Sequence, residues 1–289
     1  MYVNRVCVVG AGVMGSQIVQ LLAVNGYEVS MTDIEDRFVQ NGLQSIKGNL
    51  QKYFVDKGKM TQEEADKVVG RIAGTADLKR AVEGVQVVIE SVTEDMVLKQ
   101  QTFKRLDELC APETILASNT SSLSITAIGS LTRRQDKVIG MHFFNPVAVM
   151  RLVEIIRGFK TSDKTCEVIK DMSAKLGKET IIVNKDVPGF VVTRLFLVLC
   201  NEAIKLLEEG VATVEDIDKG CRLGLGHAMG PLKSQDIVNG IPVGLHAMDY
   251  MRAELGEYYR ASPLLRRKVE AGELGVKTGK GFYDYSQQK

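Results

Sequence analysis

Short apolar runs alternate with segments of helical spacing along most of the chain before residue 185. The runs are continuous, as in strands that are buried on both faces of a parallel sheet. They lie at 5–9, 28–32, 85–89, 115–118, 138–142, 152–153 and 181–183. Between them, helices are predicted at 35–57, 61–70, 95–109 and 164–175. Strands that alternate with helices predict an α/β fold built on a parallel sheet.

A glycine-rich turn follows the first apolar run directly. Gly10, Gly12 and Gly15 form a G-x-G-x-x-G pattern between that strand and a helix that begins near Val13 and Met14. Glycines at this spacing allow a tight turn and let the backbone approach a pyrophosphate, which then lies at the helix N-terminus. The turn therefore predicts a Rossmann-type dinucleotide site lined by these five residues. FAD and S-adenosylmethionine use similar turns, and some such turns bind nothing.

The second apolar run ends in an acidic residue. Asp33 follows the strand at 28–32, roughly 20 residues after the glycine pattern, where an acid binds the ribose 2′-hydroxyl of NAD. It would repel the 2′-phosphate of NADP. Arg37, close by in the sequence, argues the other way, because a cation can accommodate that phosphate. Asp33 therefore predicts NAD as the cofactor.

Polar side chains that can handle a proton follow three later strands. Ser121 lies in the hydroxyl run 118–122, His142 closes the run at 138–142, and Glu154 follows 152–153. We expect all three at strand ends on one edge of the sheet, where open α/β folds place their chemistry. A histidine with a carboxylate partner is a common apparatus for proton transfer near neutral pH.

Each of these groups also has a purely structural interpretation. His142 could be a hydrogen-bonded core histidine. The hydroxyl run could serve as no more than the N-cap of a helix that begins near Ser124. The glutamate that follows His142 favours the catalytic interpretation. The other two histidines lack such neighbours, so His227 is expected to shape a loop and His246 to be structural within a helix.

The pattern changes near residue 185. Apolar residues between 190 and 209 fall on a helical stripe, and shorter helices are predicted at 214–223, 242–254 and 262–271. The sequence therefore predicts a Rossmann-type dinucleotide-binding domain over 1–185, followed by an all-helical C-terminal domain over 186–289.

Six spaced motifs resemble those of one enzyme family. They lie at 10–15, 118–122, 141–146, 188–190, 229–231 and 277–283, in the family's order. From Val6 to Tyr285 the chain is similar to the short-chain (S)-3-hydroxyacyl-CoA dehydrogenases, most closely to the bacterial 3-hydroxybutyryl-CoA dehydrogenases. The resemblance implies an NAD-dependent oxidoreductase that transfers a hydride between NAD(H) and carbon 3 of a short-chain 3-hydroxyacyl-CoA, such as the 3-hydroxybutyryl-CoA/acetoacetyl-CoA pair.

The resemblance also implies roles for single residues. His142 corresponds to the catalytic acid/base, Glu154 to its orienting partner, and Ser121 to a residue that contacts the substrate oxygen. Lys52 and Lys57 lie on the helix predicted at 35–57, where they either face solvent or contact CoA phosphates. Further positions that the family uses to line the cofactor or the CoA side of the pocket are Glu94, Lys99, Asn145 and Lys277.

Departures from the family pattern lie in the helical domain. Thr193 stands where the family usually has an asparagine that helps to hold the substrate and the histidine. We expect the threonine hydroxyl to keep this catalytic role in reduced form, with a packing role as the alternative. Ala228 replaces a common proline, and residues 234–240 differ around Asp236. These differences bear on the acyl preference more than on the redox chemistry.

Two other functions remain open from the sequence. One is a dehydrogenase of a free hydroxy acid such as carnitine or gulonate, although by resemblance the run 141–146 argues for an acyl-CoA. The other is a catalytically idle Rossmann binding protein. The intact Ser121, His142 and Glu154 argue against that function.

Composition narrows the partners. A net charge of +1 gives no reason to expect nucleic acid or an anionic membrane surface, and no apolar run reaches the roughly 18 residues of a membrane span. Five cysteines without a C-x-x-C pattern predict buried thiols rather than a metal site or disulfides. A strand that begins at residue 5 leaves no room for a targeting segment, so a cytoplasmic protein is expected.

The helical domain is expected to have two further roles. Its apolar segment 191–207, together with the resemblance, predicts a homodimer joined through this domain. The same stripe could instead be internal core. The cleft between the two domains is expected to hold the acyl chain.

Overall fold

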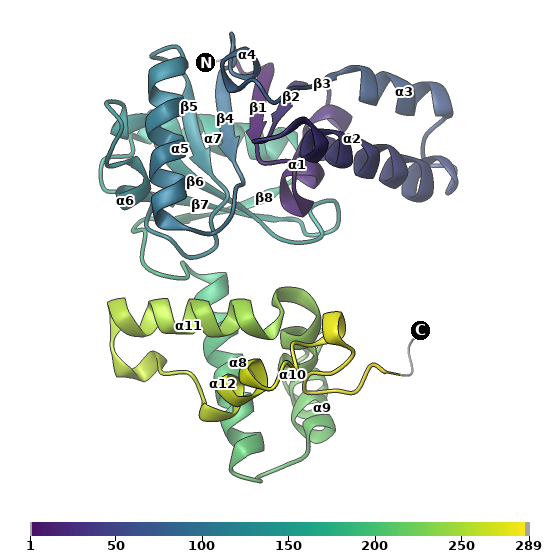
Figure 1. Cartoon of the computed structure of the whole chain (residues 1–289), viewed down its shortest axis with the longest axis vertical. Coiled ribbons are helices and arrows are strands. Elements are labelled where there is room, and N and C mark those ends of the chain that lie inside the picture. Colours follow the sequence, from purple (N-terminus) through teal and green to yellow (C-terminus); the bar gives the residue numbers. More distant parts are fainter. Residues whose placement is uncertain (1, 287–289) are drawn as a thin grey trace. The chain divides into compact units, whose positions relative to one another are not determined.

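The computed structural model describes residues 2–286, and at Val238 and Asn239 it describes the backbone alone. The side chains of these two residues, which belong to the predicted departure from the family pattern at 234–240, therefore lie outside the described residues. Residues 287–289 of the predicted helical domain also lie outside them. The chain divides into two compact units, Met1–Val187 and Pro188–Lys289. The first contains the sheet and the second is helical (Figure 1).

An eight-stranded sheet forms the centre of the first unit, in the order β3-β2-β1-β4-β5-β6-β7-β8. The strands are β1 (Arg5–Val9), β2 (Glu28–Thr32), β3 (Ile72–Gly74), β4 (Val87–Glu90), β5 (Ile115–Ser118), β6 (Val138–Phe143), β7 (Leu152–Arg157) and β8 (Glu179–Val183). All neighbouring strands are parallel except β6 and β7. The predicted fold class is confirmed, with a sheet that is mostly rather than wholly parallel.

The antiparallel step at β7 corrects one expectation. Glu154 does not follow a strand that ends at the catalytic edge; it lies inside β7, which starts there and runs the other way. A parallel strand needs a crossover of about a dozen residues or more. The connecting segment 144–151 is shorter than that, so β7 must turn back along β6.

Helices cover the sheet, and α5 lies over one face (Figure 1). The helices of the first unit are α1 (Val13–Val24), α2 (Asp36–Leu50), α3 (Gln62–Gly70), α4 (Leu78–Ala81), α5 (Met96–Leu109), α6 (Ile125–Gly129) and α7 (Asp163–Lys175). The helix predicted at 35–57 changes at residue 51 into a π-helical turn, Gln51–Val55. Thr61 and Glu64 form a capping box that starts α3 after this turn.

The second unit packs its helices around a separate core. They are α8 (Val192–Glu208), α9 (Val214–Gly224), α10 (Pro231–Ser234), α11 (Ile241–Leu255) and α12 (Pro263–Glu270). A π-helical turn, Gln235–Asn239, follows α10. Short 3-10 helices lie at Gln135–Lys137 in the first unit and at Glu257–Tyr259 and Val276–Thr278 in the second. The core of the second unit includes Leu197, Ile204, Leu232 and Met251. Among the described residues, no helix is long and apolar enough to cross a bilayer.

Candidate active site

Hydrogen bonds join the carboxyl ends of the central parallel strands. Ser91 N donates to Val9 O at 2.7 Å, and Asn119 N donates to Glu90 O at 2.7 Å. The side-chain oxygen of Asn119 accepts a hydrogen bond from Phe143 N at 2.9 Å. The ends of β1, β4, β5 and β6 are therefore held at one edge of the sheet, and the residues just beyond them share one site.

His142 and Glu154 face each other across β6 and β7. The antiparallel register pairs them directly, and His142 Nδ1 lies 2.7 Å from Glu154 Oε2. Both side chains are buried, and Glu154 has no exposed surface. A carboxylate against Nδ1 favours the tautomer that carries its proton on Nδ1, which leaves Nε2 as the acceptor. The structure thus brings together the two residues that the sequence pairs.

Glu94 holds the hydroxyl run that follows β5. Its Oε1 accepts from Thr120 Oγ1 at 2.6 Å and from Ser121 N at 2.9 Å. Ser121 itself is exposed, so its hydroxyl is available to a ligand. The run does not cap the next helix, because the N-cap of α6 is Ser124.

The glycine-rich turn has the shape that a dinucleotide site requires. Gly10 has a φ of 106°, and a Cβ added at Gly15 would lie 1.8 Å from Gly10 O. No atom lies within 4 Å of the Cβ position of Gly12, so the space beside it is open. Helix α1 begins with no side-chain cap and no acidic residue in its first turn. Its first N–H groups are therefore left for an anion such as the pyrophosphate of NAD.

Asp33 lies beside the same turn. Its Oδ2 accepts from Ala11 N at 2.7 Å, and its Oδ1 accepts from Ile34 N at 2.7 Å. Arg37, the cation that argued for NADP, has a carboxylate partner of its own, with Nε 2.9 Å from Glu35. The fixed acid beside the turn and the pairing of Arg37 with Glu35 both support NAD.

Lys99 lies in the interior rather than on a ligand-lining surface. Its side chain has no exposed area, and Nζ lies 2.7 Å from Glu90 Oε1 and 3.4 Å from Glu94 Oε2. Contact with a cofactor would require this ammonium group to leave its ion pair. Lys99 therefore lies between two carboxylates inside the unit, closer to Glu90 than to Glu94.

Asn145 lies in the segment between β6 and β7, and α1 holds it there. Gln17 donates from Nε2 to Asn145 Oδ1 at 3.1 Å and accepts from Val147 N at 2.8 Å. Lys178 donates to Val147 O at 2.5 Å, and burial lowers the pKa of this lysine. Asn145 is thus tied to the helix that follows the glycine-rich turn.

The other predicted residues belong to other elements of the chain. Lys52 and Lys57 are exposed on the π-helical turn after α2 and just beyond it. Thr193, near the start of α8, is half-buried, and Lys277 is exposed in the short helix Val276–Thr278. Both belong to the helical unit.

The segment around Asp236 fastens the chain that carries Lys277. Asp236 is buried and accepts hydrogen bonds from Phe282 N and Tyr283 N, both at 2.9 Å. Burial raises the pKa of this carboxyl. Tyr283 also donates to Asp218 at 2.8 Å. The residues near 236 that depart from the family pattern therefore flank a buried carboxylate that fixes the C-terminal segment.

Two models of one family match consecutive parts of the chain. The description "3-hydroxyacyl-CoA dehydrogenase, NAD binding domain" matches residues 5–187, and "3-hydroxyacyl-CoA dehydrogenase, C-terminal domain" matches residues 189–285. The chain belongs to the 3-hydroxyacyl-CoA dehydrogenase family. The resemblance inferred from the sequence is confirmed, and the glycine-rich turn lies in the family's NAD-binding domain.

Individual relatives extend over the whole chain. This family member is 45% identical over 289 residues to a probable 3-hydroxybutyryl-CoA dehydrogenase of Bacillus subtilis (strain 168), covering 100% of this chain and 99% of the relative. It is 41% identical to the mitochondrial hydroxyacyl-coenzyme A dehydrogenase of Homo sapiens, over 98% of this chain and 91% of the relative. The crystal structure of (S)-3-hydroxybutyryl-CoA dehydrogenase from Ralstonia eutropha is similar with a TM-score of 0.94 and 42% identity, covering 99% of this chain and 100% of that one.

Two side chains of this dehydrogenase that were not predicted from the sequence connect elements near the site. Gln17 joins α1 to the segment after His142, and Glu90 joins Lys99 to β5. The sequence does carry a signal for Glu90, because it is an acidic residue at the end of an otherwise apolar strand. Asp33 has a similar position directly after β2. Gln17 carries no such signal.

Proposed function

We propose that this chain is an NAD-dependent dehydrogenase of short-chain 3-hydroxyacyl-CoA thioesters, acting on the 3-hydroxybutyryl-CoA/acetoacetyl-CoA pair. The observation that carries the proposal is the buried His142–Glu154 pair, joined at 2.7 Å, in the same unit and at the same edge of the sheet as the dinucleotide turn. Relatives named for 3-hydroxybutyryl-CoA, at 45% and 42% identity, support the short acyl chain.

Each residue of the site has a separate role in the proposed reaction. Bound NAD⁺ supplies the acceptor for the hydride of carbon 3. His142 takes the hydroxyl proton on Nε2, and the Glu154 carboxylate stabilises the imidazolium that results. Ser121 donates a hydrogen bond to the same oxygen as it becomes a carbonyl. In the reverse direction His142 returns the proton. Positioned acid–base groups of this kind contribute about 10²- to 10⁴-fold to the rate.

Several ligand contacts are part of the proposal. We assign Lys52 and Lys57 to the CoA phosphates, because both are exposed cations. We assign Asn145 and Lys277 to the cofactor or the CoA side of the pocket, on the strength of the resemblance. Thr193 stands at the position of the family's asparagine, and we propose that its hydroxyl contacts the substrate as that asparagine does.

We also propose a cytoplasmic homodimer. The five cysteines are free, four of them buried, which suits a reducing compartment. The exposed apolar side chains at and just before the start of α8, such as Val191 and Leu195, support association between two copies of the chain.

A substrate panel tests the function. NADH consumption by the purified protein should be fastest with acetoacetyl-CoA, slower with longer 3-ketoacyl-CoA substrates, and much slower when NADPH replaces NADH. His142→Ala should abolish turnover and retain NADH binding. Oxidation of carnitine or gulonate in preference to the thioesters would instead identify a free hydroxy-acid dehydrogenase. NADH binding without turnover of any 3-ketoacyl-CoA would identify a binding protein.

A further inference from the structure

A fully buried carboxylate lies beneath the site and takes no direct part in the proposed reaction. Glu90 ends β4 and has no exposed surface. Its Oε1 accepts hydrogen bonds from Lys99 Nζ and Val92 N, both at 2.7 Å. Its Oε2 accepts from Ser118 Oγ at 2.6 Å. Every one of these partners belongs to the end of β4, the end of β5 or the first turns of α5.

Lys99 connects this carboxylate to a second one. Its ammonium group lies 2.7 Å from Glu90 but 3.4 Å from Glu94, so the buried carboxylate holds it more closely. Two carboxylates and one ammonium leave the cluster with one surplus negative charge. At these separations in a low-dielectric interior, a change in any one charge is felt strongly by the other two.

Glu94 is the member of the cluster that reaches the site. One of its oxygens faces Lys99, and the other accepts from Thr120 Oγ1 and Ser121 N. The position of the Ser121 backbone therefore depends on where Glu94 lies. The position of Glu94 depends in turn on how strongly Lys99 draws it inward.

We propose that Glu90 is a positioning residue of this dehydrogenase, which holds Lys99 away from Glu94 and so leaves Glu94 free to fix Ser121 against the substrate oxygen. This inference rests on the proposed function. When Glu90 loses its charge, Glu94 becomes the only anion beside Lys99. Glu94 is then drawn toward Lys99 and releases the loop that carries Ser121.

The variant Glu90→Gln tests this arrangement because it keeps the shape and removes the charge. Misplacement by about 1 Å near the reacting atoms can cost on the order of 10²-fold in rate. We expect kcat with acetoacetyl-CoA to fall by about 10- to 100-fold at saturating NADH, with a much smaller change in KM.

A matched control separates positioning from simple loss of a buried ion pair. Asp107, also on α5, is buried and lies 2.7 Å from Arg134 Nε, at the opposite end of that helix from Lys99. Glu90→Gln and Asp107→Asn should both lower the unfolding temperature. Only Glu90→Gln should reduce kcat.

A double-mutant cycle shows whether the effect passes through Ser121. Ser121→Ala should cost much less in the Glu90→Gln background than in the wild type, because the serine is already displaced there. In the Asp107→Asn background the cost of Ser121→Ala should be unchanged. Multiplicative losses for Glu90→Gln and Ser121→Ala would overturn the proposal.

Hydrogen exchange on the protein without substrate or cofactor gives a result that does not depend on activity. Glu90→Gln should speed amide exchange in residues 119–123, where Ser121 N donates to Glu94, and Asp107→Asn should not. If Glu90→Gln does not fold, Ser118→Ala, which removes one of the hydrogen bonds to Glu90, should give a smaller increase in the same segment. Unchanged exchange would refute the positioning role even if the enzyme is active. A wild type without 3-ketoacyl-CoA activity would refute the function and leave the exchange result to decide the role of Glu90.

Discussion

The imidazole of His142 lies against a carboxylate that has no contact with solvent. A buried carboxylate is costly unless it is paired and hydrogen-bonded. The Glu154 carboxylate is therefore best stabilised beside a positively charged imidazolium, and His142 is in this state after Nε2 has taken the substrate proton. The two residues form one chemical unit, because the charge of each changes the stability of the other.

Variants at these two positions should not be independent. We predict that His142→Ala and Glu154→Gln each reduce kcat by several orders of magnitude, while the Kd for NADH changes little. The double variant should lose little more than His142→Ala alone, because groups that act as a unit are non-additive. Steady-state kinetics of the four proteins provides the measurement. Losses that multiply would show that the two residues act separately.

Asp33 has a structural role and a proposed role in cofactor selection. Its carboxylate accepts a hydrogen bond from Ala11 N and so anchors the glycine-rich turn. We propose that its negative charge also repels the 2′-phosphate of NADPH. We predict that Asp33→Ala weakens NADH binding and narrows the preference over NADPH. Asp33→Asn keeps an acceptor for Ala11 N, so it should narrow the preference with a smaller loss of NADH affinity. Titrations with both cofactors measure this. Faster wild-type turnover with NADPH at low cofactor concentration would contradict the role.

At the scale of the element, the turn between β1 and α1 contains glycines that are needed for different reasons. Gly15 is required by packing, because a Cβ there would overlap Gly10 O. Gly12 has an ordinary extended backbone, with φ −69° and ψ −168°, and open space around it. The protein alone therefore does not require glycine at residue 12, but a pyrophosphate that lies close to the backbone does.

Alanine variants of these two glycines should separate folding from binding. We predict that Gly12→Ala has nearly the unfolding temperature of the wild type and binds NADH at least about tenfold more weakly, which is about 1.4 kcal/mol. Gly15→Ala should lower the unfolding temperature by several degrees, because overpacking typically costs about 1–3 kcal/mol. Thermal melts and NADH titrations measure both effects. A Gly12→Ala protein with unchanged affinity would show that the cofactor does not approach this residue.

The turn after α12 gives the helical unit a pH-dependent contact. Glu273 pairs with Lys268 at 2.8 Å and with Lys280 at 2.6 Å, and these hydrogen bonds lower the pKa of its carboxyl to about 2. Because the folded pKa is below the ordinary 4.5, the contribution to stability is complete above about pH 4.5 and is lost as the pH falls toward 2.

Removing the charge of Glu273 should therefore lower the free energy of unfolding near neutral pH but not in acid. We predict that Glu273→Gln lowers the free energy of unfolding by about 1 kcal/mol or less at pH 7, in keeping with a partly exposed ion pair. The difference from the wild type should shrink at pH 3. Glu270→Gln, a nearby exposed carboxylate, serves as the control. Denaturant unfolding at both pH values tests this, and an effect that is equal at the two would contradict it.

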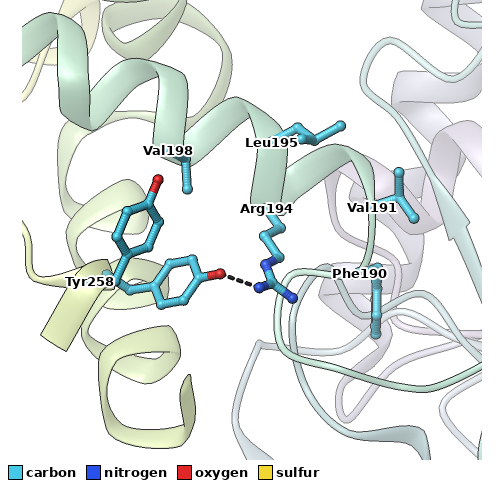
Figure 2. A pocket seen from close by; sticks show the side chains of 7 residues that line it. Phe190, Val191, Arg194, Leu195, Val198 and Tyr258 are labelled. Atoms are coloured by element: carbon cyan, nitrogen blue, oxygen red, sulfur yellow. Dashed lines mark hydrogen bonds between the residues drawn. The ribbon is translucent and has the colours of Figure 1, made fainter. Parts of the chain in front are cut away.

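At the scale of the whole molecule, each unit has its own core, and the helical unit also presents apolar side chains to solvent. Leu195 is 68% exposed and Tyr258 is 74% exposed. They line a cavity of about 330 Å³ together with Arg194, which donates a hydrogen bond to Tyr259 (Figure 2). The apolar stripe of α8 is thus core in part, as at Leu197, and exposed in part, as at Leu195. Exposed apolar surface of this kind is typical of an interface.

A charge at this surface should separate the two copies of a dimer. We predict that light scattering of the wild type gives twice 31.8 kDa at micromolar concentration. Leu195→Asp should shift the mass toward a single chain. Leu131→Asp changes an exposed leucine of the first unit and should leave the mass unchanged. A wild-type mass near that of one chain would refute the dimer.

The features that depend on neighbours in the chain could be predicted from the residues alone. The turn between β1 and α1, the acid after β2 and the continuous apolar strands follow from local backbone and burial preferences, so their positions could be predicted. The coarse helices were also predictable. The change to a π-helical turn at Gln51–Val55 and the short elements β3, α4 and α10 were not, because segments of three to five residues are too short to show a periodic pattern.

Contacts between side chains on different elements depend on how the strands and helices pack. Glu154 reaches His142 because β7 runs antiparallel to β6, and the register of that pairing is a property of two strands together. The resemblance implied that Lys99 lines the cofactor or the CoA side of the pocket, but its side chain is buried against Glu90, at the end of β4, the strand that precedes α5. The sequence thus determined the chemical groups and the local turns, since these depend on adjacent residues. The folded sheet determined which charged side chains form pairs, because they come within contact distance only when the strands are packed together.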